Sequence, residues 1–161
     1  MATLTVTITE SLPDYNGADN DLTLTNALSI SGVDDIYHRI VTVPATVDTT
    51  LANFHATTGV ADSSLDVENV KYIRVTNLDG SNPVNLSLQV DAGEDDTAAD
   101  ASTTLLLEAG KSFIMGSPSD GIATDDDAAT IITTLNNLES IIADSASAAV
   151  KVEVFIASVV A

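Results

Sequence analysis

Two short runs of carboxylates are the residues best suited to chemistry in this sequence. They are Glu94, Asp95 and Asp96 in one run and Asp125, Asp126 and Asp127 in the other. Hard cations such as Ca²⁺ take several carboxylate and carbonyl oxygens, which polar loops can supply. Neither run has EF-hand spacing, and an acidic loop also serves simply to keep a protein soluble. We therefore expect no metal or other cofactor, and calcium at these six carboxylates is the alternative.

The side chains that usually perform catalysis are present but are not grouped. The two histidines, His38 and His55, lie beside aromatic or basic neighbours and are not tied to a nucleophile or a third ligand. A metal or catalytic site needs several convergent groups. The many serines and threonines occur in no GxSxG motif, and no glycine-rich phosphate loop is present. The sequence predicts that the protein is not an enzyme.

The charge balance excludes further classes of function. The chain has 24 acidic and 5 basic residues, a formal net charge of -19. Binding of phosphate backbones or anionic lipid headgroups requires Lys and Arg, so we expect neither a nucleic-acid nor a membrane partner. Carbohydrate binding is weakly supported, because the chain has no Trp and only three Tyr and three Phe. The start, MATLTVTITE, lacks a signal-peptide pattern, so we expect a protein that is made in the cytoplasm without a signal peptide.

The elements that must position any site are strands. The segment TLTVTITE alternates Leu4, Val6 and Ile8 with threonines, which is typical of a half-buried strand. DLTLTNALSI repeats this alternation, and a third strand is expected from Asp34 to Pro44. The length of 161 residues fits one domain spanning 1–161.

The clearest local pattern is KYIRVTNLDGSNPVNLSLQV, from Lys71 to Val90. It predicts a β-hairpin with strands at Val70–Asn77 and Val84–Val90. Gly80 is expected to supply a positive φ in the turn, and Pro83 to set the start of the return strand.

The second half of the chain continues in the same style. An acidic loop from Asp91 to Ser102 precedes two short apolar runs joined around Ala109 and Gly110. Helical spacing predicts a short helix near Asp127 to Asn136, and a strand is expected from Leu138. Many short strands with at most one helix indicate a mainly β fold, an antiparallel β-sandwich or jelly roll.

The last predicted strand, AVKVEVFIASVVA, is apolar on both faces. One face carries Val150, Val152, Val154, Ile156 and Val160, and the other carries Phe155, Ala157 and Val159. A strand that is apolar on both sides must be covered on both sides. The strand is therefore either a central core strand or partly an intersubunit contact, with Phe155, Ala157 and Val159 as the interface residues.

Four segments together resemble small virion structural proteins of tailed bacteriophages, particularly marine phages. They are MATLTVTITESL, KYIRVTNLDGSNPVNLSLQV, LLLEAGKSFIMGSP and KVEVFIAS. The resemblance implies a many-copy particle component without catalytic residues: an exterior capsid decoration or cement protein, or a tail-associated subunit. Its implied partners are other copies of itself, as a homo-oligomer, and a coat or tail protein. The alternative is a tail-fibre or adhesin module that binds a host-surface glycan, with calcium as an aid.

Overall fold

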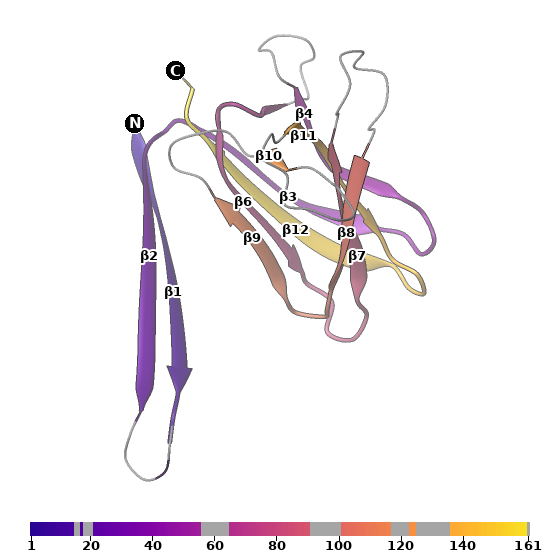
Figure 1. Cartoon of the computed structure of the whole chain (residues 1–161). Helices are drawn as coiled ribbons and strands as arrows, with labels where there is room; N and C mark the ends of the chain where they lie inside the picture. The colour runs from indigo at the N-terminus through magenta and orange to yellow at the C-terminus, as the bar shows by residue number, and fades with distance from the viewer. Residues whose placement is uncertain are drawn as a thin grey trace.

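The regular elements of the protein are strands. The computed structural model describes residues 1–14, 17, 21–55, 65–90, 101–116, 123–124 and 136–160, and none of these is helical. Two main sheets pack face to face, and a separate hairpin lies beside them (Figure 1). The predicted mainly β, sandwich-like fold is therefore confirmed.

The strands of the two main sheets come from distant parts of the chain. Their bounds, with those of the hairpin, are β1 Ala2–Leu12, β2 Leu22–Val33, β3 Asp35–Val43, β4 Thr49–His55, β5 Leu65–Asp66, β6 Val70–Asn77, β7 Val84–Val90, β8 Ala101–Leu107, β9 Ser112–Gly116, β10 Ala123–Thr124, β11 Asn136–Asp144 and β12 Val150–Ser158. One sheet has the order β5-β4-β11-β7-β8, with β10 paired to β11. The other has the order β3-β12-β6-β9.

The core lies between these two sheets, and the period-two alternation of the sequence builds it. Leu51, Phe54 and Ile141 point inward from one sheet, and Ile73 and Ile156 point inward from the other. All five are almost completely buried. Burying an aliphatic or aromatic side chain of this size stabilises a fold by about 1.5–3 kcal/mol. The alternating segments therefore supply most of the hydrophobic stabilisation.

The predicted hairpin between residues 70 and 90 is wrong, although both strand bounds are correct. β6 pairs with β12 and β9, whereas β7 pairs with β11 and β8. The two strands thus lie in opposite sheets and face each other across the core, with Val75 and Leu86 buried between them. Alternation specifies which side chains turn inward, but a strand that folds over the core buries the same residues as one that pairs beside it. The stretch is an arch between sheets.

Side chains, rather than Gly80, hold this arch together. Gly80 is not among the residues with positive φ, so that prediction is also wrong. Buried Asn77 donates through Nδ2 to the carbonyls of Asn82 and Leu107 at 2.9 and 3.1 Å. Asp79 Oδ1 accepts hydrogen bonds from the backbone N–H groups of Ser81 and Asn82 at 2.8 and 2.7 Å. The backbone hydrogen bond from Asn82, and to a lesser extent that from Ser81, lowers the pKa of Asp79 below its ordinary value.

Other sequence predictions have mixed outcomes. Strands appear as expected at β1, β2 and β3, and β11 begins at Asn136, two residues before the expected Leu138. The apolar runs around Ala109 and Gly110 form β8 and β9, which also lie in opposite sheets. The expected helix lies outside the described residues except for its last residue, Asn136, which is in β11. Most of the acidic loop, residues 91–100, also lies outside the described residues.

The C-terminal strand β12 is central in its sheet, as one of the two alternatives predicted. It pairs with β3 on one side and with β6 on the other. Its residues Val150, Val152, Val154 and Ile156 are completely buried against the opposite sheet. The chain end is fixed by further bonds: the Val159 N–H donates to the Asn69 carbonyl, and the Val160 N–H donates to Asp34 Oδ1.

The N-terminal hairpin stands apart from the sandwich. β1 and β2 pair only with each other, from Ala2–Val33 at the base to Leu12–Leu22 near the tip. Figure 1 shows the hairpin beginning beside the two chain ends and extending past the edge of the sandwich. The termini and the hairpin base therefore lie together.

Candidate functional site

The β1–β2 hairpin has one apolar face and one polar face, because both strands alternate in phase. We call the apolar side the arm face; it consists of Leu4, Val6, Ile8, Leu12, Leu22, Leu24, Leu28 and Ile30, with Glu10 and Asn26. The opposite side carries threonines, serines and an alanine. A two-stranded ribbon is only marginally stable in water and needs packing on one face. The composition therefore marks the arm face as a contact surface.

The base of the arm face packs against the chain's own sheet. Ile30 and Val33 are buried with Tyr72 of β6 and Ala157 of β12, and Leu4, Val6 and Leu28 lie against them. A bulge at Gly32, whose φ is +80°, turns both Ile30 and Val33 toward the sheet. This small second core attaches the hairpin to the outer side of the sandwich.

The distal half of the arm face has no such cover among the described residues. Ile8, Leu12, Leu22 and Leu24 continue the same apolar side, yet their side chains are 38% to 53% exposed. Isolated exposed apolar residues are common on proteins, but several on one face of one element form a patch that marks a contact. The distal arm face is such a patch.

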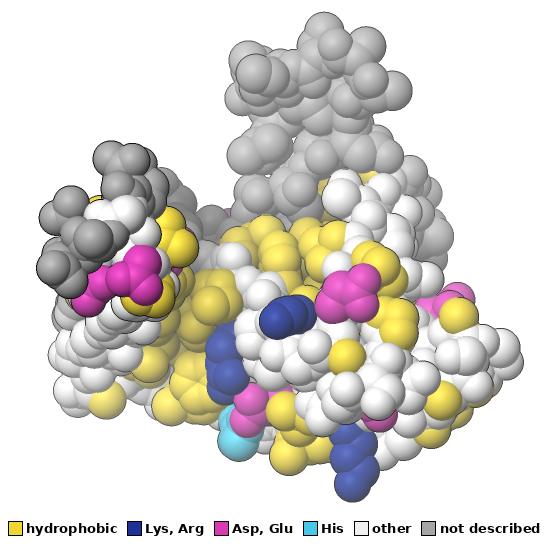
Figure 2. All heavy atoms as spheres, turned by 90° about the horizontal axis from the view of Figure 1, so that it is seen from below, with side chains coloured by type: hydrophobic (Ala, Val, Ile, Leu, Met, Phe, Trp, Pro, Cys, Tyr) yellow, Lys and Arg dark blue, Asp and Glu magenta, His cyan; other side chains and the backbone are white. Residues whose placement is uncertain are grey.

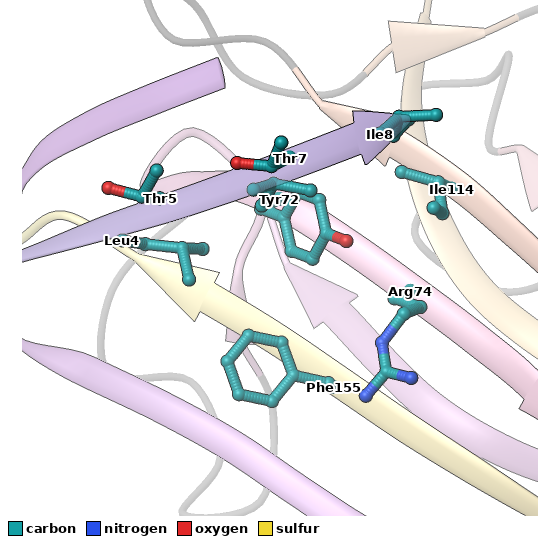
Figure 3. A pocket seen from close by; sticks show the side chains of 9 residues that line it. Leu4, Thr5, Thr7, Ile8, Tyr72, Arg74, Ile114 and Phe155 are labelled. Carbon is teal, nitrogen blue, oxygen red and sulfur yellow. The ribbon is translucent and has the colours of Figure 1, made fainter. Parts of the chain in front are cut away.

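A groove runs between the hairpin and the sheet. It encloses about 410 Å³ and is lined by Leu4 to Ile8 on one side and by Tyr72, Arg74, Ile114 and Phe155 on the other. Figure 3 shows Leu4, Tyr72, Phe155 and Arg74 around this space, with Ile8 and Ile114 near its distal end. Figure 2 shows hydrophobic side chains gathered between the hairpin and the sandwich.

The groove opens onto the outer face of the β3-β12-β6-β9 sheet. We call this the outer face. Its residues are Ile36, His38, Ile40 and Thr42 of β3, Lys151, Glu153, Phe155 and Ala157 of β12, Tyr72, Arg74 and Thr76 of β6, and Ser112, Ile114 and Gly116 of β9. Ile36, Ile40 and Ile114 are 41% to 59% exposed. The hairpin covers the outer face at Ala157 and Tyr72. The exposed isoleucines lie on the two edge strands of this sheet, Ile36 and Ile40 on β3 and Ile114 on β9.

Charged side chains at the centre of the outer face pair with one another. Glu153 lies 2.9 Å from both His38 Nε2 and Arg74 Nη2. The His38 hydrogen bond, with a smaller effect of Arg74, holds the pKa of Glu153 below its ordinary value. Phe155 packs between the His38 and Tyr72 rings, with centroids 6.0 and 6.1 Å away. These contacts fix the orientation of Arg74 and Phe155 in the groove.

The three residues predicted as an interface all lie at this site. Ala157 is completely buried beneath the hairpin, whereas Phe155 and Val159 are half-buried against the same cluster. The second apolar face of β12 is thus covered near its end by β1 and β2 of the same chain. Contact with a partner through Phe155 and Val159 stays a prediction.

The other residues considered for chemistry are separated. His38 is on β3 and His55 ends β4, in different sheets. The candidate calcium ligands Glu94, Asp95, Asp96, Asp125, Asp126 and Asp127 all lie outside the described residues. Within the described ranges, no group of three or more metal-ligating side chains is placed to hold an ion, and no helix could cross a membrane.

Tyrosines serve packing in the described part of the chain. Tyr37 donates its hydroxyl to the Leu51 carbonyl at 2.8 Å, and Arg39 stacks over its ring. Tyr72 is buried under the hairpin, and this burial raises the pKa of its phenol. Tyr15 lies outside the described residues.

Sequence reasoning missed the arm face and the outer face, on which the base of the hairpin packs. The signal was available, because TLTVTITESL and DLTLTNALSI both place leucine, isoleucine or valine at every second position over a long strand, except at Glu10 and Asn26. The missing information was that these two strands pair only with each other. A strand's length and alternation do not say whether a second layer covers all of it.

Comparison with known proteins found no match to this chain among family models, curated proteins or solved structures.

Proposed function

We propose that this protein is a non-enzymatic structural component of a phage virion that acts through protein–protein assembly. The observation that carries the proposal is the projecting arm, whose apolar face continues past its own sheet. A long two-stranded ribbon is marginally stable in water without cover on one face, so its uncovered leucines suit a subunit that contacts neighbours in a particle. The resemblance of the sequence to small virion proteins of tailed phages supports the same reading.

The net charge favours an exterior position in the particle. At -19, the chain is repelled by packaged DNA, whereas a capsid decoration or cement protein, or a tail-associated subunit, does not face the nucleic acid. The chain would reach this position from the host cytoplasm during particle assembly.

Quantitative mass spectrometry of gradient-purified phage particles tests the proposal. We expect peptides of this chain to copurify with the particles. A stoichiometry comparable with the coat protein would indicate capsid decoration, and one comparable with a tail protein would indicate a tail subunit. Absence of the chain from intact particles would overturn the proposal.

A host-surface binding module is the second candidate. The groove favours it, because the half-buried Phe155 ring and the nearby Arg74 guanidinium could contact a sugar. Tyr72 is buried beside them and offers no free ring face. A glycan array probed with and without calcium distinguishes the two functions, since an assembly subunit is expected to give no saturable glycan signal.

A further inference from the structure

We propose that the distal arm face of one copy docks on the outer face of a second copy of this chain. This inference rests on the proposed assembly function and names the partner of the arm. It concerns Ile8, Leu12, Leu22 and Leu24 on the arm, and Ile36, Ile40 and Ile114 on the outer face.

The first argument is that the two surfaces already fit each other within one chain. The base of the arm face covers one end of the outer face, where Leu28 lies so close to Gly116 that a Cβ there would be 3.1 Å from Leu28 Cδ2. The uncovered part of the arm face and the uncovered part of the outer face are continuations of this contact. A second copy brings both parts together without any new kind of surface.

The second argument is charge. Residues 1–33 contain no Lys or Arg, and the described hairpin carries Glu10 on the arm face, with Asp14 and Asp21 near the tip. Two of the chain's five basic residues, Arg74 and Lys151, lie on the outer face beside the exposed isoleucines. Glu153 of the same face pairs with Arg74, so these two cations and one carboxylate leave the receiving face with one net positive charge, which an acidic arm complements. Such complementarity sets partner and register at an interface.

The third argument is geometric. The hairpin extends beyond its own sandwich (Figure 1), and a groove separates its residues Leu4 to Ile8 from Arg74 and Ile114 of its own outer face, so the arm does not cover this face within one chain. Each copy offers one arm and one receiving face, so the contact can be reciprocal in a dimer or repeat around a closed ring. Either assembly covers both patches.

The test measures self-association of the purified full-length chain by sedimentation equilibrium, with circular dichroism as the check on folding. We expect the wild type to associate, and Leu24→Glu and Ile40→Glu each to weaken association by about tenfold or more because each places a charge in the contact. Both side chains are exposed, so both variants should keep the wild-type spectrum. Each new carboxylate lies opposite a glutamate of the neighbouring strand, Glu10 or Glu153, so the melting temperature should fall slightly.

Matched controls separate the proposed contact from a general effect of added charge. Thr25→Glu places the same charge one residue away on the polar face of the hairpin. Leu106→Glu removes an exposed leucine from the outer side of the other sheet. Both controls should associate like the wild type.

Three results would overturn the inference: a wild type that stays monomeric at the highest soluble concentration, association unchanged in Leu24→Glu or Ile40→Glu, or equal weakening in the controls. A monomeric chain that is nevertheless found in purified particles would leave the proposed function standing and would exclude only this partner. A chain that self-associates as proposed but is absent from particles would support the second copy as the partner of the arm and would overturn the proposed function.

Discussion

At the scale of single residues, the six-residue arch from Leu78 to Pro83 shows that a polar side chain can define a turn where a glycine is expected to do so. Asp79 accepts two backbone hydrogen bonds, and the Asp79 N–H in turn donates to Asn77 Oδ1 at 2.9 Å. Gly80 has neither a positive φ nor a neighbour within 4 Å of an added Cβ. The glycine is therefore replaceable.

A pair of glycine substitutions tests this reading. Gly80→Ala should change the free energy of unfolding by no more than about 0.5 kcal/mol, as for an unconstrained surface site. Gly110→Ala is the matched comparison, because its Cβ also meets open space but its φ is +70°. It should cost about 1–2 kcal/mol, the penalty for an L-residue in the left-handed region. Denaturant melts of both variants measure this, and equal costs would contradict the assignment of strain to φ alone.

The ion pairs of Glu153 give a pH dependence whose sign follows from its lowered pKa. A carboxylate with a lower pKa in the folded state stabilises the protein above its unfolded-state pKa, and the contribution is lost as the pH falls through the folded-state value. Wild type should therefore be more stable than Glu153→Gln near pH 7. The difference should begin to fall near pH 4, about the ordinary pKa of a glutamate, and should be lost only below the lower folded-state pKa. Thermal melts across this range measure it.

Glu108→Gln is the control for that series. Glu108 is exposed between β8 and β9, and its side chain makes no ion pair among the described residues. The stability of the Glu108→Gln protein should therefore follow that of the wild type at each pH. A Glu153→Gln protein as stable as wild type at pH 7 would mean that the contacts with His38 and Arg74 contribute nothing measurable.

At the scale of elements, the sequence predicts where strands lie much better than which strands pair. The bounds of β6 and β7 could be predicted to the residue, because Val, Ile and Leu at every second position leave little choice of inward face. Their pairing could not, because it depends on partners such as β12, more than 60 positions away along the chain. The two apolar faces of β12 predict that it needs cover on both sides, but only the fold identifies the β1–β2 hairpin as the second cover.

The two sides of β12 predict opposite responses to the same substitution. Val152→Asp places an unpaired carboxylate in the core between the sheets, where Val152 is completely buried, so it should abolish the cooperative unfolding transition. Lys151→Asp, one residue earlier on the exposed side, should leave the transition near its wild-type position. Thermal melts of both variants, followed by circular dichroism, measure the two transitions. A cooperative, wild-type-like Val152→Asp would contradict the central position of this strand.

At the scale of the whole molecule, the candidate site consists of apolar side chains that the chain does not cover itself. The sandwich has a complete core between its sheets, and the hairpin has a second, smaller core at its base. Beyond these, the distal arm face is an apolar patch on a strongly acidic protein, and the outer face exposes isoleucines on both of its edge strands. High net charge keeps subunits soluble and apart, so only a locally complementary contact can bring copies together.

The same net charge sets the expected response to calcium. With 24 acidic and 5 basic residues, any divalent cation screens repulsion over the whole surface and should raise the melting temperature slightly without saturation. Saturation of a specific site would instead add stability in proportion to the logarithm of calcium concentration over its Kd. We expect calcium and magnesium at equal concentration to give the same small shift by differential scanning fluorimetry. A larger shift with calcium alone, abolished in the double variant Asp95→Asn and Asp96→Asn, would show a calcium site and would favour the host-binding function over assembly.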